Sequence, residues 1–86
     1  MKCSIEISMY PLDNCHETII INFIKSLYAH PFIKIETNGM STQLFGDYDH
    51  VMKAIQIEMK KSFLIQQKVV FTIKVVNAQL DEKPSF

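Results

Sequence analysis

Apolar and polar residues alternate without interruption along "CSIEISMY", residues 3–10 of the chain. A period of two residues is typical of a half-buried β-strand, with one face in the core and the other open. Pro11 ends this strand, because proline cannot donate a further ladder hydrogen bond. The predicted core face carries the apolar side chains Cys3, Ile5, Ile7 and Met9.

Residues 15–29 change to helical spacing, and His30-Pro31 ends the segment. Asp13 or Asn14 can cap such a helix, and Glu17 suits its positive first turn. The apolar stripe of this helix consists of Ile20, Phe23, Ile24, Leu27 and Tyr28. Ile19 and Ile21 widen the stripe beyond what one sheet face needs, which hints at a partner surface.

Asn38-Gly39 stands between two alternating runs and predicts a β-hairpin with a two-residue loop, because both residues tolerate a positive φ. This loop would pair Thr37 with Met40 and Ile33 with Leu44. The pairing directs Ile33, Ile35, Thr42 and Leu44 toward the core and Lys34, Glu36, Ser41 and Gln43 away from it. Thr42 needs a hydrogen-bond partner or a pocket, since its hydroxyl lies among aliphatic side chains.

A second helix follows from Asp47, a good N-cap, to about Phe63. Its predicted buried stripe is Val51, Met52, Ile55, Met59 and Phe63. A run dense in β-branched residues predicts the last strand at about 68–77. We interpret residues 1–78 as a single domain and residues 79–86, "QLDEKPSF", as a loose C-terminal tail.

The predicted order is strand, helix, strand, strand, helix, strand. Right-handed crossovers place the first strand between the third and the fourth. The expected fold is therefore an α+β, ferredoxin-like βαββαβ sandwich, with a four-stranded antiparallel sheet in the order 4-1-3-2 and two helices on one face. The uncovered face mixes polar and apolar residues, so it could be solvated or could pack against a second subunit.

Composition narrows the function classes. Nine lysines balance nine acidic residues and there is no arginine, so the charge gives no reason to expect a nucleic-acid or anionic-membrane partner. No apolar run reaches the roughly 18 residues that suggest a spanning helix, and the first residues lack the apolar region of a signal peptide. We therefore expect a cytoplasmic protein with reduced thiols.

The expected topology brings the end of the first strand and the hairpin to one edge of the sheet. Hydroxyl, amide and aromatic groups gather there, and they could orient a small polar heterocycle. Thr42 argues for a pocket on the helix side, whereas Ser41 and Glu6 argue for the open side. Glu6 could instead only form a salt bridge with Lys74. The candidate ligand-binding residues are Glu6, Ser8, Tyr10, Asn38, Met40, Ser41 and Thr42.

Catalysis finds little support in the sequence. Each histidine stands apart, and Asp47, Asp49 and His50 fit a helix cap better than a metal cluster. No glycine-rich phosphate loop or Ser-His-Asp arrangement is evident. We expect a protein that is not an enzyme and needs no metal or cofactor.

Two motifs give the chain a recognisable pattern. One is "EISMYPL", which ends in Tyr10-Pro11-Leu12, and the other is "TNGMSTQLFGDYDHVM", which runs from Asn38-Gly39 through Met40-Ser41-Thr42 to Gly46-Asp47. Together they resemble the YkoF-like thiamine-binding family, whose members bind thiamine or its hydroxymethylpyrimidine moiety. The similarity covers roughly residues 3–76.

The resemblance implies a non-catalytic binding protein in thiamine precursor uptake or salvage, which associates through its sheets as a homodimer or homotetramer. It places Tyr10, Ser41 and Thr42 beside the ligand, with Asn38 and Met40 close by. Some members carry two such domains in tandem, whereas this sequence shows one, so the resemblance implies that a complete site needs a dimer or tetramer. The alternative is an oligomeric regulatory or interaction domain that binds another metabolite or a protein.

Overall fold

A computed structural model describes residues 1–12, 17–65 and 68–85 of the chain. The elements are β1 (Lys2–Pro11), α1 (Glu17–Tyr28), β2 (Ile33–Thr37), β3 (Thr42–Asp47), α2 (Tyr48–Ile65) and β4 (Val69–Val76). Their order confirms the prediction. The predicted cap at Asp13 or Asn14, together with Cys15 and His16, lies outside the described residues.

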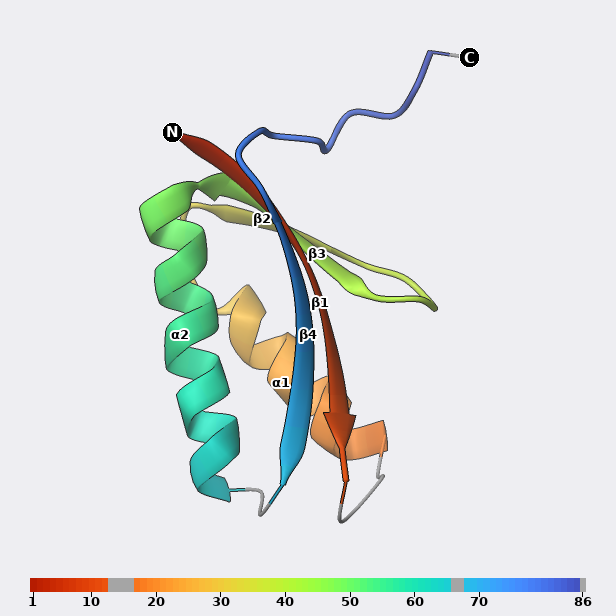
Figure 1. Cartoon of the computed structure of the whole chain (residues 1–86), viewed down its shortest axis with the longest axis vertical. Coiled ribbons are helices and arrows are strands. Elements are labelled where there is room, and N and C mark those ends of the chain that lie inside the picture. The colour runs from red at the N-terminus through yellow and green to blue at the C-terminus, as the bar shows by residue number, and fades with distance from the viewer. Residues whose placement is uncertain (13–16, 66–67, 86) are drawn as a thin grey trace.

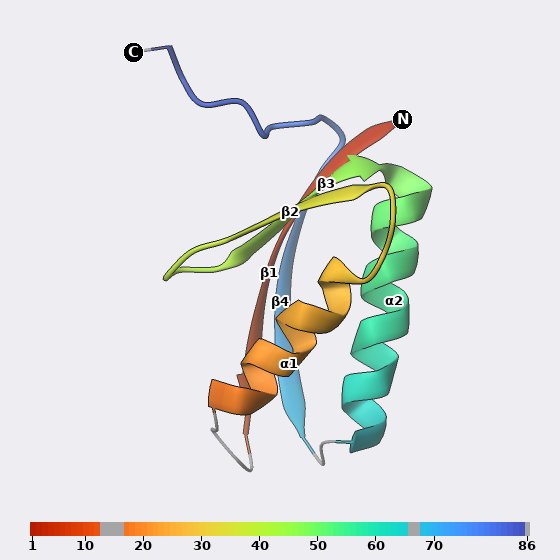
Figure 2. The same ribbon diagram turned by 180° about the vertical axis from the view of Figure 1, so that it is seen from behind.

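The strands form one sheet in the order β2-β3-β1-β4, and each neighbouring pair is antiparallel. Both helices cover the same face of this sheet (Figures 1 and 2). The chain therefore has the predicted ferredoxin-like α+β fold. β1 lies between β3 and β4, so its alternating pattern reaches both halves of the molecule.

The core lies between the sheet and the helices. The predicted apolar face of β1 is buried there, and so are Leu27 of α1, Leu44 of β3 and Val51 of α2. Phe63 was predicted in the buried stripe of α2, and this prediction is wrong, because its side chain is exposed. Its ring makes an edge contact with Phe71 on β4, with the ring centroids 5.7 Å apart.

The hairpin differs from the prediction in its register. Thr37 pairs with Thr42, and Ile33 pairs with Gly46, so the loop contains four residues, 38–41. The physical reason is the Asn38 side chain, whose Oδ1 accepts hydrogen bonds from the amides of Met40 at 2.9 Å and Ser41 at 3.1 Å. A shift by two residues keeps every side chain on its predicted face, which is why Thr42 and Leu44 are still buried.

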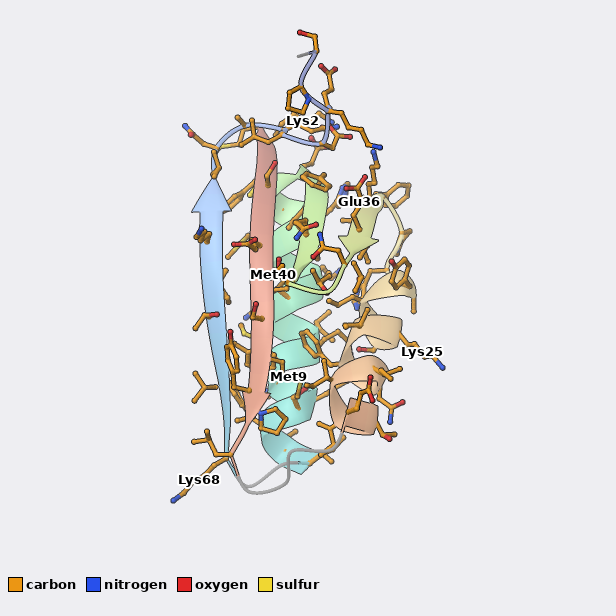
Figure 3. All side chains as sticks on the ribbon, turned by 90° about the vertical axis from the view of Figure 1, so that its right-hand side faces the viewer. Lys2, Met9, Lys25, Glu36, Met40 and Lys68 are labelled. Atoms are coloured by element: carbon orange, nitrogen blue, oxygen red, sulfur yellow. The ribbon has the colours of Figure 1, made fainter. Side chains whose placement is uncertain are left out.

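The residues after β4 cross the end of the sheet beside β1 and β3 (Figure 3). Ser4, predicted on the open face, is only 6% exposed because this segment covers it. The Ser4 hydroxyl donates to the Ala78 carbonyl at 2.6 Å and accepts from the Leu80 amide at 2.9 Å. A salt bridge of 3.2 Å joins Lys34 to Asp81. The start of the tail predicted to be loose is thus tethered to the sheet.

Candidate functional site

A gap opens in the sheet where the pairing of β1 with β3 stops. That pairing ends at Ile7 and Thr42, whereas β1 continues beside β4 as far as Pro11 and Val69. The last four residues of β1 therefore have a strand partner on one side only. The hairpin loop and α1 border the other side, as Figure 2 shows.

A cleft of about 220 Å³ occupies this gap. Six of the seven predicted site residues line it, and all six contribute from β1 or the hairpin: Ser8, Tyr10, Asn38, Met40, Ser41 and Thr42. The volume lies below the roughly 300–1,000 Å³ of pockets that hold drug-sized ligands, so the cleft suits a single small ring. It lies at the sheet's edge, where Ser41 and Thr42 can both border it although they were predicted on opposite faces.

The floor of the cleft is apolar. Sequence reasoning placed its side chains in the core and did not foresee that they border a cavity; they are Ile7, Met9, Ile20, Phe23 and Ile24. Phe23 also packs against Phe71 in a tilted arrangement, with the ring centroids 4.9 Å apart. The five floor residues have the helix and strand spacing of ordinary core positions. The sequence pattern therefore does not distinguish a side chain that lines a cleft from one that is packed in the core.

The hairpin loop is held by its own hydrogen bonds. Besides the two bonds to the Asn38 side chain, the Asn38 amide donates to the Ser41 carbonyl at 3.1 Å. Met40 is 89% exposed at the rim of the cleft, and Figure 3 places it on the loop beside β1. The loop therefore presents a fixed backbone and one freely exposed apolar side chain.

Thr42 is 4% exposed, and its hydroxyl lies 3.3 Å from that of Thr37 across the hairpin. This contact supplies the partner that the sequence argument required. Each hydroxyl has one proton and two acceptor sites. One of these hydroxyls donates to the other, and both threonines line the cleft.

Glu6 does not line the cleft but lies behind Ser41. The Ser41 hydroxyl donates to Glu6 Oε2 at 2.9 Å, and Gln43 Nε2 donates to the same hydroxyl at 2.6 Å. Lys74 Nζ lies 3.5 Å from Glu6 Oε1, so the salt bridge considered as an alternative role is formed. The Ser41 hydrogen bond and the Lys74 charge hold the pKa of Glu6 below its ordinary value of 4.5.

A second polar cluster, which the sequence reasoning missed, lies between the helices. His30 Nε2 contacts Glu58 Oε2 at 2.6 Å, and Lys61 Nζ lies 3.6 Å from the same oxygen. A second cleft of about 250 Å³ borders Glu58 and Lys61. The burial of Glu58 could have been predicted from the sequence, since position 58 continues the helical spacing of Val51 and Ile55 on the buried face of α2.

Asp47 ends β3, and α2 begins at the next residue. It pairs with Lys2 at 3.3 Å and lies 4.0 Å from His50 Nδ1. Within residues 1–12, 17–65 and 68–85, no group of three or more His, Cys, Asp or Glu side chains could hold a metal ion. Burial raises the pKa of the Cys3 thiol, which disfavours its reactive thiolate form.

Neither helix of the described residues has the length and hydrophobicity needed to span a membrane. This agrees with the sequence, in which no sufficiently long apolar run occurs.

Several solved structures are similar to this fold. A hypothetical protein from Methanocaldococcus jannascii is 26% identical, with a TM-score of 0.77 over 95% of this chain and 84% of its own. A Thermotoga maritima protein, described provisionally as a thiamine biosynthesis/salvage protein, is 17% identical, with a TM-score of 0.74 over 87% of this chain and 82% of its own. A Streptococcus pneumoniae protein is 19% identical, with a TM-score of 0.72 over 93% of this chain and 90% of its own.

No protein-family model and no curated protein matches the sequence. The structural similarities establish the fold.

Proposed function

We propose that this protein is a non-catalytic carrier that binds thiamine or its hydroxymethylpyrimidine moiety in the cytoplasm, during thiamine precursor uptake or salvage. The observation that carries the proposal is the cleft itself, which gathers six residues predicted from the sequence on an apolar floor. The similarity to the T. maritima thiamine biosynthesis/salvage protein supports the same ligand class.

The lining suits a small aromatic heterocycle. Phe23 and Met9 offer an apolar surface for the ring, and the half-exposed Tyr10 lies at the mouth of the cleft. The hydroxyls of Ser8 and Thr42 offer hydrogen-bonding groups to ring nitrogens and an exocyclic amine. Ser41, whose proton goes to Glu6, can offer an acceptor only. Glu6, held ionised through its contacts with Ser41 and Lys74, favours a ligand that carries donors or positive charge.

The proposal includes assembly through the sheets into a homodimer or homotetramer. β4 is an edge strand, and it exposes apolar side chains on both of its faces: Val70, Ile73, Val75 and Val76. An edge strand with such exposed residues favours pairing or packing with another chain.

Calorimetric titration with thiamine and with hydroxymethylpyrimidine tests the carrier function. We expect saturable binding near micromolar, about 8 kcal/mol. Thr42→Val keeps the shape but removes the hydroxyl of a residue that lines the cleft, so it should weaken binding by roughly three- to tenfold. Thr18→Val, an exposed position on α1 outside the cleft lining, is the matched control and should bind like the wild type.

A folded protein that gives no heat with either compound would contradict the carrier proposal. The second candidate, an oligomeric regulatory or interaction domain, would then be the better-supported function, because β4 exposes apolar residues. Sedimentation at several protein concentrations would measure the assembly that this candidate requires.

A further inference from the structure

The lining of the cleft is electrically neutral. Among the described residues that line the cleft, only Tyr10 has an ionisable side chain, a phenol. A bound phosphate group is normally neutralised by Lys or Arg, or it accepts hydrogen bonds from free backbone amides. We therefore asked whether either means of holding a phosphate lies within reach of the cleft.

The lysines for which the structure gives an ion pair are held elsewhere. Lys74 pairs with Glu6 behind Ser41, and Lys34 pairs with Asp81 near the tail. Lys25 and Lys68 extend from the periphery of the molecule, away from Met9 and Met40 (Figure 3). The chain has no arginine to take their place.

Three of the four backbone amides of the hairpin loop are also occupied, so successive free amides are not present there. Such a loop is a common anion-binding nest when successive amides point outward. Here the amides of Met40 and Ser41 donate to the Asn38 side chain, and the Asn38 amide donates to the Ser41 carbonyl. At the other wall, Glu17 lies in the first turn of α1 and offsets the positive end of that helix.

The ionised group that the lining reaches through Ser41 is Glu6, whose one neighbouring cation, Lys74, is already paired with it. Ser41 bridges the cleft to the Glu6 carboxylate through a 2.9 Å hydrogen bond. A phosphate ester in the cleft would bring further negative charge toward this carboxylate without a cation of its own, and desolvating an unpaired anion is costly.

We infer that the cleft selects an unphosphorylated heterocycle, neutral or cationic, and rejects the phosphate esters of the same compound. This inference rests on the proposed function and specifies its ligand class. It also sets a direction of transfer. A separate enzyme that moves the γ-phosphoryl group of a nucleoside triphosphate to the ligand hydroxyl, releasing the nucleoside diphosphate and the hydroxyl proton, produces an ester that the cleft no longer holds. The reaction that consumes the carried molecule would thus be a kinase-type step.

Parallel titrations test the selection. Thiamine, thiamine monophosphate, hydroxymethylpyrimidine and hydroxymethylpyrimidine phosphate are compared at one pH and one ionic strength. We expect each ester to bind at least tenfold more weakly than its parent alcohol. Met40→Lys adds a cation at the rim and should narrow the ratio between ester and parent at least threefold, whereas the neutral Met40→Gln should not.

The outcomes separate the two proposals. Ester and parent binding with equal affinity would overturn the selection and leave the carrier function standing. The selection would also be overturned if Met40→Gln narrowed the ratio of ester to parent affinity as much as Met40→Lys, because the effect would then not come from charge. No binding of any of the four compounds would overturn the carrier function, and the selection with it.

Discussion

His30 and Glu58 join the two helical segments of the fold through one short contact, 2.6 Å between Nε2 and Oε2. His30 lies just after α1, and Glu58 lies on α2 with 4% of its surface exposed. Burial, the largest single cause, raises the pKa of Glu58, but the hydrogen bonds from His30 and Ser26 and the charge of Lys61 together outweigh it and hold the pKa below its ordinary value of 4.5. The buried carboxylate is therefore stabilised in its charged form.

We predict that Glu58 makes the protein acid-sensitive. Because its pKa is depressed on folding, its contribution is complete above pH 4.5 and is lost as the pH falls through the folded-state value. Glu58→Gln should lower the free energy of unfolding by roughly 1–3 kcal/mol at pH 7, since it leaves His30 and Lys61 without a charged partner. Urea unfolding from pH 7 to pH 3 should show the stabilities of wild type and Glu58→Gln converging as the pH falls.

Glu82→Gln, exposed in the tail, is the control for this experiment. Equal stabilities of Glu58→Gln and wild type at pH 7 would contradict a stabilising role of the Glu58 charge.

The loop of the hairpin gives a second prediction. Asn38→Ala removes the oxygen that accepts from the amides of Met40 and Ser41, and it should reduce the free energy of unfolding by about 0.5–2 kcal/mol. Asn38→Asp keeps an oxygen at this position and should retain most of the stability. Thermal unfolding of both variants, with Asn77→Ala as the exposed control, measures the difference. If Asn38→Ala matched Asn77→Ala, the side-chain bonds would not hold the loop.

This hairpin also shows what the sequence could and could not predict. The alternating pattern placed Ile35, Thr42 and Leu44 on the correct face, because a register error of two residues leaves faces unchanged. The loop length was not predictable from Asn-Gly alone. The hydrogen bonds to the Asn38 side chain stabilise a four-residue loop in place of the two-residue turn. Turn propensities do not account for such side-chain bonds to the backbone.

The candidate site was partly predictable for a related reason. Topology alone brings the end of β1 to the hairpin, so six residues of the cleft could be named before the structure. Glu58 was overlooked although it occupies a helical core position. A charged side chain is rarely buried without a charged or hydrogen-bonding partner, and its partner His30 is distant in the sequence. The anchoring of the tail was hidden in the same way, since Ser4 and Leu80 are 76 residues apart.

Ser4 should hold the tail on the sheet. Its hydroxyl both donates and accepts, so Ser4→Ala leaves the Ala78 carbonyl and the Leu80 amide without this partner. We expect a loss of roughly 1–2 kcal/mol in the free energy of unfolding. Hydrogen exchange at the Leu80 amide should become much faster while the core amides of β1 stay protected. Ser85→Ala is the control in the exposed tail, and unchanged exchange at Leu80 in Ser4→Ala would show that the tail is held by other contacts.

The last prediction concerns the charge behind the cleft. The hydrogen bond from Ser41 is the largest cause of the lowered pKa of Glu6, followed by the charge of Lys74. Ser41→Ala should therefore raise the pKa of Glu6 toward 4.5, as measured by NMR titration of its carboxyl carbon. Salt separates the two causes, because it screens an exposed charge such as Lys74 more than a direct hydrogen bond. In the wild type, added salt should raise this pKa, and in Lys74→Gln it should have little effect. A pKa that stays constant in Ser41→Ala would mean that Ser41 does not connect Glu6 to the cleft, and the electrostatic basis for rejecting phosphate esters would then rest on the neutral lining alone.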